Sequence, residues 1–169
     1  MPWVQFLPGA PKKEMSMDEQ HREVCEDLFN KFSMAMSQTG SAVPIYVMIL
    51  EDDTVYPIVV NEAIEFQEYA KIALNIANQY DAYAMILICE QYMVSKKTGD
   101  ADLSALLSGQ IRASEHPDRE EYLTLVYLDE NGESESLIGK IERDLMGTPF
   151  TRESKWLQDT VVSVMMPWK

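Results

Sequence analysis

The sequence predicts an α+β fold in which two helices pack on a mostly antiparallel sheet of five or six strands. Three observations support this prediction. Apolar residues recur at helical spacing around residues 17–37 and 62–80. Short apolar runs bounded by turn residues fill most of the remainder, as is typical of strands. The stretch Asp129-Glu-Asn-Gly132 joins two such runs and contains the Asn-Gly pair that is favoured in β-hairpin turns.

The first helix is expected over about residues 17–37. Ser16 and Glu19 have the spacing of a capping box, in which each side chain accepts a backbone N–H of the other residue. Gly40 is the expected end of this helix, because glycine adopts positive φ without strain. His21 falls on this helix, and its expected place on the polar face of the helix explains it without a functional role.

The region after the first helix predicts two strands, a second helix and a central strand. Residues 45–50 and 55–60 form the two strands, and Pro57 lacks an N–H, which predicts that the second strand lies at a sheet edge. Asn61 is the expected cap of the second helix. The apolar run at 82–89 shows no alternation, which predicts a strand covered on both faces. Because this strand follows a helix, a parallel strand pair is compatible with the order of elements.

The 169 residues fit an N-terminal arm over 1–15 and a single domain over 16–169 that ends in an apolar tail. Cys25 and Cys89 are expected to be buried core residues, which is typical of a protein from a reducing compartment. No apolar run approaches the roughly 20 residues that span a bilayer, and the first ten residues do not resemble a secretory signal. We therefore expect a cytoplasmic protein without membrane contact.

Acidic residues strongly outnumber basic ones: 28 Asp and Glu against 14 Lys and Arg, for a formal net charge of -14. No Lys or Arg occurs from Phe32 to Ala70, which we call the base-free window. Such a surface repels phosphate backbones, so direct nucleic-acid binding is disfavoured and a protein partner with a basic surface is favoured. The candidate binding residues are the acids of this window: Glu51, Asp52, Asp53, Glu62, Glu65 and Glu68.

The stretch Ser114–Glu121 holds the densest set of potentially reactive side chains. A catalytic metal or acid–base site there would use Glu115, His116, Asp118 and Glu120. These residues do not share one helical face, and Pro117 biases His116 away from helix. A structured turn with local backbone hydrogen bonds explains the same residues. We therefore predict no bound metal and no cofactor, and an enzyme is the less favoured hypothesis.

Two resemblances involve this stretch. Pro117-Asp118 followed by Glu153-Ser-Lys155 resembles the motif of restriction-type metal-dependent nucleases. The stretch Ser-Glu-His-Pro-Asp-Arg-Glu-Glu at 114–121, with a following apolar strand and then Ile141-Glu-Arg-Asp144, resembles small proteins of bacteria, phages and prophages. Those proteins have a Ser-Glu-x-Pro-Asp-Arg turn before a strand. This second resemblance spans about residues 84–147 and implies a bacterial host cytoplasm, but it implies no activity and no catalytic residues.

Both chain termini are apolar and are candidate interfaces between copies of the chain, through Trp3, Phe6, Leu7, Val164, Met165, Met166 and Trp168. Docking there would give a homo-oligomer. The function that we expect is non-enzymatic: an acidic protein that binds or assembles with other proteins, including a phage-encoded inhibitor of a basic host or defence protein. The alternative is a metal-dependent hydrolase or nuclease centred on residues 114–121.

Overall fold

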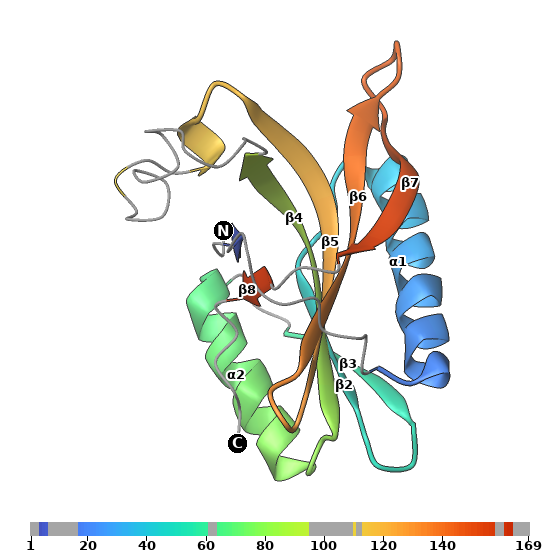
Figure 1. Ribbon diagram of the computed structural model, residues 1–169, viewed down its shortest axis with the longest axis vertical. Coiled ribbons are helices and arrows are strands. Elements are labelled where there is room, and N and C mark those ends of the chain that lie inside the picture. The colour runs from blue at the N-terminus through green and yellow to red at the C-terminus, as the bar shows by residue number, and fades with distance from the viewer. Residues whose placement is uncertain are drawn as a thin grey trace.

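The computed structural model describes residues 4–6, 17–60, 64–94, 110, 113–157 and 161–163. A six-stranded sheet lies between two helices, α1 (Glu19–Thr39) and α2 (Phe66–Gln79), which cover its opposite faces (Figure 1). The strand order is β3-β2-β4-β5-β6-β7, and all neighbouring strands are antiparallel. The predicted α+β fold is therefore confirmed.

The six strands of this sheet are β2 (Ile45–Ile49), β3 (Val55–Ile58), β4 (Ala84–Val94), β5 (Arg119–Asp129), β6 (Ser134–Arg143) and β7 (Pro149–Leu157). A short 3-10 helix, η1 (Ala113–Glu115), precedes β5. Strands β1 (Val4–Phe6) and β8 (Val161–Ser163) form a separate antiparallel pair. The remaining residues of the two predicted interface segments, Trp3, Leu7, Val164, Met165, Met166 and Trp168, lie outside the described residues, as does the side chain of Phe6.

The parallel pair that the order of elements permitted does not occur between neighbouring strands of this sheet, although the helical crossover behind it exists. Strand β4 lies between β2 and β5 and runs antiparallel to both. Because β3 is also antiparallel to β2, β3 and β4 point in the same direction but are separated by β2. Helix α2 connects them across that intervening strand. Strand β3, which contains Pro57, lies at the sheet edge as predicted.

Helix α1 covers one face of the sheet through Cys25, Phe29 and Met36, which are almost completely buried. The helix starts at Glu19, because the side chain of Asp18 acts as the N-cap and accepts the His21 N–H at 2.8 Å. The predicted cap Ser16 lies outside the described residues. Gly40 ends the helix with φ of 88°, as expected, and donates its N–H to the Met36 carbonyl.

Helix α2 covers the other face with two small side chains, Ala73 and Ala77, which are completely buried. It begins at Phe66 with Glu65 as its N-cap, and the Glu65 side chain makes no capping hydrogen bond. The predicted cap at Asn61 is therefore wrong, because α2 starts five residues further along the chain.

Strand β4 has both faces buried, as its apolar run predicted. Ile86 and Ile88 point toward α1, whereas Met85 and Leu87 point toward α2. On β6, Gly139 allows α1 to approach closely: a Cβ there would lie 3.0 Å from Phe29 Cζ and 3.2 Å from the Glu153 carbonyl oxygen. The sheet thus separates two cores that share strands but not side chains.

The β5–β6 and β6–β7 turns have the same construction. In the first, Asp129 accepts the N–H groups of Asn131 and Glu133, and Gly132 adopts φ of 79°. In the second, Asp144 accepts the N–H groups of Met146 and Thr148, and Gly147 adopts φ of 82°. The first hairpin was predicted; the second was not, although Asp144 and Gly147 have the same Asp-x-x-Gly spacing.

Candidate functional site

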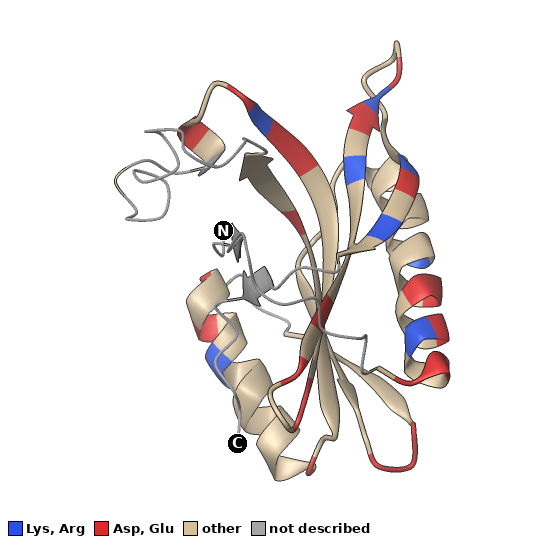
Figure 2. Cartoon of the chain, viewed as in Figure 1, with Lys and Arg blue, Asp and Glu red and all other residues tan. Residues whose placement is uncertain are grey.

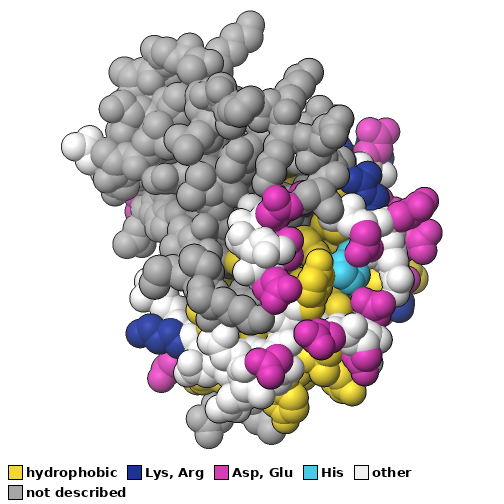
Figure 3. Space-filling view, turned by 60° about the horizontal axis from the view of Figure 1, so that its bottom comes forward, with side chains coloured by type: hydrophobic (Ala, Val, Ile, Leu, Met, Phe, Trp, Pro, Cys, Tyr) yellow, Lys and Arg dark blue, Asp and Glu magenta, His cyan; other side chains and the backbone are white. Residues whose placement is uncertain are grey.

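Four carboxylates from three distant segments meet at one end of the sheet, where α1 begins and the β2–β3 and β5–β6 turns lie. They are Asp18, Asp53, Asp129 and Glu130, and we call this group the acidic end. Figure 3 views this end and shows acidic side chains gathered around hydrophobic ones. The negative charges of all four raise the pKa of the phenol of Tyr83, a residue that follows α2 in the chain. Acidic turns at this end are also visible at the bottom of Figure 2.

Backbone hydrogen bonds fix Tyr83 between the turns. Its N–H donates to the Ile49 carbonyl at 2.8 Å, and its carbonyl accepts the Glu130 N–H at 2.9 Å. Burial raises the pKa of the Tyr83 phenol, and the charges of Asp129, Asp18, Glu130 and Asp53 raise it further. The phenol therefore remains a neutral hydrogen-bond donor surrounded by negative charge.

His21 lies within this group, and its interpretation as an ordinary polar-face residue is wrong. The side chain is 5% exposed. Its Nδ1 lies 3.1 Å from the Tyr127 hydroxyl and 3.3 Å from Asp18 Oδ2, and its Nε2 lies 3.3 Å from Asp53 Oδ1. The imidazole therefore ties α1 to the β2–β3 turn. Its position four residues before Cys25, on the buried stripe of α1, is the sequence signal that was missed.

The acids of the base-free window do not form one patch. Glu51, Asp52 and Asp53 belong to the β2–β3 turn at the acidic end. Hydrogen bonds from the Thr54 side chain and backbone lower the pKa of Asp52, so that this carboxylate stays ionised. Glu65 and Glu68 lie at the start of α2, at its opposite end from Tyr83 (Figure 1). Glu62 lies outside the described residues.

Residues 114–121 run from the end of η1 through a short turn at 116–118 into β5. His116 is buried, and its Nδ1 accepts the Asp118 N–H at 3.1 Å while its carbonyl accepts the Arg119 N–H at 3.2 Å. Arg119 also lies over the Tyr92 ring at 5.6 Å. Glu115, the last residue of η1, is exposed. One imidazole nitrogen is thus used to hold the turn.

The acids that follow this turn pair with bases on β6. Glu120 binds Lys140 and accepts the Tyr122 hydroxyl, and the Lys140 interaction is the main reason that the pKa of Glu120 is lowered. Glu121 binds Arg143 at 2.7 Å. Among the described residues, no group of three or more His, Cys, Asp or Glu side chains is placed to hold a metal ion. The geometry thus gives no support to the hydrolase alternative.

The nuclease resemblance likewise gains nothing from the structure. Glu153 and Lys155 lie on the edge strand β7, on either side of Ser154. Ser154 is opposite Gly139 of β6, and Gly139 is opposite Leu123 of β5, so Leu123 marks the level of this motif on β5. Asp118 precedes Leu123 by five positions, which is about 17 Å of extended chain. That separation is too large for one metal ion to contact both groups.

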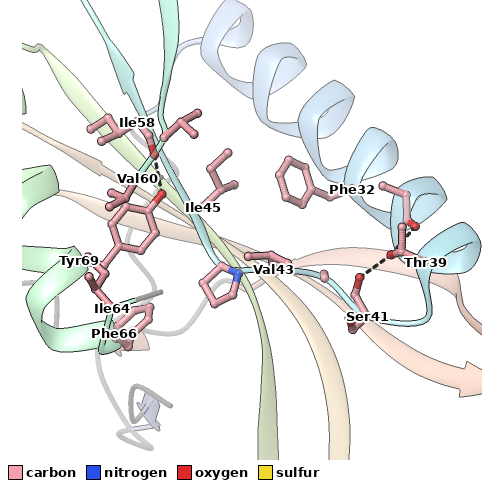
Figure 4. Close-up of a pocket in the computed structure, with 14 residues that line it drawn as sticks. Phe32, Thr39, Ser41, Val43, Ile45, Ile58, Val60, Ile64, Phe66 and Tyr69 are labelled. Carbon is pink, nitrogen blue, oxygen red and sulfur yellow. Dashed lines mark hydrogen bonds between the residues drawn. The ribbon is translucent and has the colours of Figure 1, made fainter. Parts of the chain in front are cut away.

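An apolar groove lies between the end of α1, β3 and the start of α2 (Figure 4). Its volume is about 500 Å³. The described lining is mostly aliphatic and aromatic and includes Phe32, Val43, Ile45, Val59, Phe66 and Tyr69. The segment before β2 is fixed in place because the Ala42 N–H donates to the Glu90 carboxylate at 2.6 Å. The sequence did not predict this groove, since its walls come from separate elements.

The Tyr69 hydroxyl bridges the end of the β2–β3 pair beside the groove. Tyr46 and Ile58 are opposite each other on β2 and β3. The hydroxyl accepts the Tyr46 N–H at 3.2 Å and donates to the Ile58 carbonyl at 2.5 Å. The Tyr69 ring also meets the Tyr46 ring edge-on, with centroids 5.1 Å apart. A side chain of α2 therefore bridges two strand ends and forms the floor of the groove.

Comparisons of the chain with protein-family models, curated proteins and solved structures found no match. The resemblance to small phage and prophage proteins therefore stays a prediction, as do a homo-oligomer and a bacterial cytoplasm. Among the described residues, no helix is long and apolar enough to cross a membrane.

Proposed function

We propose that the protein is a non-enzymatic binding protein whose acidic end docks on a basic surface of a partner protein. The observation that supports this most directly is geometric: His21 lies 3.3 Å from both Asp18 and Asp53, its ring centroid is 5.5 Å from that of Tyr83, and the Tyr83 carbonyl accepts the N–H of Glu130, the neighbour of Asp129. Carboxylates gathered at one end of a molecule attract a basic partner during diffusion and orient it before contact. Tyrosine is a frequent energetic centre of such interfaces, and Tyr83 is half-buried among these charges.

The described basic residues are distributed in a way that reinforces this asymmetry. Arg119 lies at the start of β5, and Lys140 and Arg143 lie near the end of β6, away from the acidic end (Figure 2). Arg22 is the basic residue next to Asp18 along α1, and it lies 3.8 Å from Glu135. Arg22, Lys140 and Arg143 pair with Glu135, Glu120 and Glu121, none of which belongs to the four carboxylates of the acidic end.

The acidic end is also held rigidly, which favours binding because few groups must be ordered on association. Gln20 donates to Asp53 at 3.2 Å, and the Met17 N–H donates to Glu135 at 3.0 Å. Together with the His21 contacts, these bonds connect the start of α1 to the β2–β3 turn and to strands β5 and β6. A partner would meet a preformed surface.

The proposal is tested by neutralising two charges with little change of shape. The double variant Asp53→Asn/Glu130→Gln removes two carboxylates, and asparagine tolerates the positive φ of 61° at position 53. The matched control Glu65→Gln/Glu68→Gln removes the same charge at the start of α2. A short lysine homopolymer serves as the basic probe. NMR amide shifts locate its contacts, and calorimetry measures its affinity at several salt concentrations.

We expect the largest amide shifts at residues 18, 53, 83 and 130. The acidic-end variant should bind the probe about tenfold more weakly, and the control should stay within about twofold of wild type. Equal weakening by both variants, or shifts spread evenly over the acidic residues, would show that only total charge matters and would reject the proposal.

A further inference from the structure

The groove between α1 and α2 is lined by a single continuous part of the sequence. Among the described residues, the whole lining falls between Phe32 and Tyr69, inside the base-free window. Two apolar side chains of this lining are strongly exposed: Val43 at 74% and Val59 at 69%. Exposed apolar side chains that gather beside a concave surface are typical of a binding site.

The size of the groove limits what it can hold. Its volume of about 500 Å³ is roughly three times the 150 Å³ apolar cavity that accommodates one benzene ring. Two or three large apolar side chains would therefore fill it. The floor offers little polar recognition, because the Tyr69 hydroxyl is already engaged by Tyr46 and Ile58.

The described charges on the α2 side of the groove are acidic, whereas on the α1 side Lys31, which precedes the lining residue Phe32, pairs with Asp27. Glu65 and Glu68 are exposed and lie next to the lining residues Phe66 and Tyr69 at the start of α2. The first base after the window is Lys71, which is exposed and does not line the groove. An occupant with basic residues beside its apolar ones would match both the lining and these acids.

We propose that this groove docks a short segment of a partner protein that presents two large apolar side chains flanked by Lys or Arg. The site is separate from the acidic end. Glu65 precedes α2 and Tyr83 follows it, and this 14-residue helix is about 20 Å long. The inference therefore does not rest on the proposed function, and either surface can fail alone.

The experiment selects displayed random short peptides on the full-length protein and measures the affinity of the enriched peptides by fluorescence polarisation. Ala35 lines the groove from an exposed position on α1, so Ala35→Phe should fill the groove without disturbing the core. Asn30→Phe is the matched control, because Asn30 is exposed on the same helix but does not line the groove. Circular dichroism verifies that both variants are folded.

The expected peptides contain paired Leu, Met or Phe residues flanked by Lys or Arg. Ala35→Phe should weaken their binding by at least about tenfold, while Asn30→Phe leaves it unchanged. Glu65→Gln/Glu68→Gln should weaken binding several-fold and reduce its salt dependence, whereas Glu19→Gln/Glu23→Gln on α1 should not.

Three outcomes would overturn the proposal. The first is an absence of enrichment, and the second is enrichment of peptides that lack basic residues. The third is binding that Ala35→Phe leaves intact. Analytical ultracentrifugation of the full-length protein tests a different occupant: a concentration-dependent dimer that Ala35→Phe abolishes would assign the groove to a second copy of the chain and reject a foreign partner.

Discussion

His21 and Tyr127, 106 positions apart in the chain, share a buried hydrogen bond of 3.1 Å that fastens the first helix to the central part of the sheet. Tyr127 is 3% exposed, and burial is the main cause that raises the pKa of its hydroxyl. The hydroxyl therefore stays protonated and bound to the imidazole. This contact connects the acidic end to the core, so its loss should be measurable as a loss of stability.

Tyr127→Phe keeps the ring and removes only the hydroxyl. We expect the free energy of unfolding to fall by about 1–2 kcal/mol, because the buried imidazole loses a partner. Urea unfolding followed by circular dichroism measures the change. Tyr92→Phe is the control, since Tyr92 is half-buried and meets Arg119 through its ring. Equal midpoints for the two variants would refute the role given to the His21 contact.

Tyr69→Phe should loosen the two strand ends that its hydroxyl bridges. The Tyr46 N–H and the Ile58 carbonyl both lose a partner, so we expect a loss of about 1–3 kcal/mol. Hydrogen exchange should become faster at the Tyr46 amide and remain unchanged at the other end of β2. Tyr56→Phe on β3 is the control, because Tyr56 is 46% exposed. Unaltered exchange at Tyr46 would contradict the bridging role.

Gly139→Ala tests the close approach of α1 to β6. The added methyl group would meet Phe29 and the Glu153 carbonyl, so we expect a loss of about 1–3 kcal/mol. Phe29→Leu gives the Phe29 side of this contact more room. The double variant should lose less unfolding free energy than the two single variants together, by at least about 0.5 kcal/mol. Simple additivity would show that Phe29 does not cause the strain.

Stability should fall at alkaline pH, in part because of Cys25. Burial, assisted by the charges of Glu135 and Glu26, raises the pKa of this thiol from 9.0 to about 12. The folded state then keeps a proton that the unfolded state has released. The contribution of the Cys25 thiol to the free energy of unfolding is therefore complete below pH 9 and is lost as the pH rises toward 12. Near pH 10–11 the slope should be about 1.4 kcal/mol per pH unit from this one group.

Urea unfolding at several alkaline pH values measures this slope. Cys25→Ala should be less stable at neutral pH because a core side chain is truncated, but its stability should decline less steeply above pH 9. Because the charge of Cys25 also raises the pKa of Tyr127, the difference in slope reports the thiol together with its coupling to Tyr127. Parallel slopes for the two proteins would mean that Cys25 does not keep its proton in the folded state.

Sequence patterns predicted the layers of this fold because they depend on local periodicity. The apolar run of β4 indicated burial on both faces, and Pro57 indicated an edge strand. The position of β4 beside β2 was not predictable, because the helical crossover permits either an adjacent or a separated strand. The β6–β7 hairpin was predictable in principle, since Asp144 and Gly147 repeat the spacing of Asp129 and Gly132.

The candidate sites were predictable only in part. The base-free window correctly marked Asp53 and Glu65 as acidic surface residues, but their places at opposite ends of α2 depend on the three-dimensional path of the chain. His21 was missed because a buried imidazole needs partners from other elements, and those partners are visible only after folding. The groove was missed for the same reason: its lining comes from α1, β2, β3 and α2, which meet only in the folded chain.

The two edges of the sheet also determine how safely the protein can exist at high concentration. An exposed strand edge is a template on which other chains can add strands and aggregate. Strand β3 offers only four residues, one of them Pro57, which has no N–H to donate. Strand β7 is longer, but the exposed charges of Arg152, Glu153 and Lys155 lie along it. The same residues that end the sheet therefore protect the protein against fibril growth.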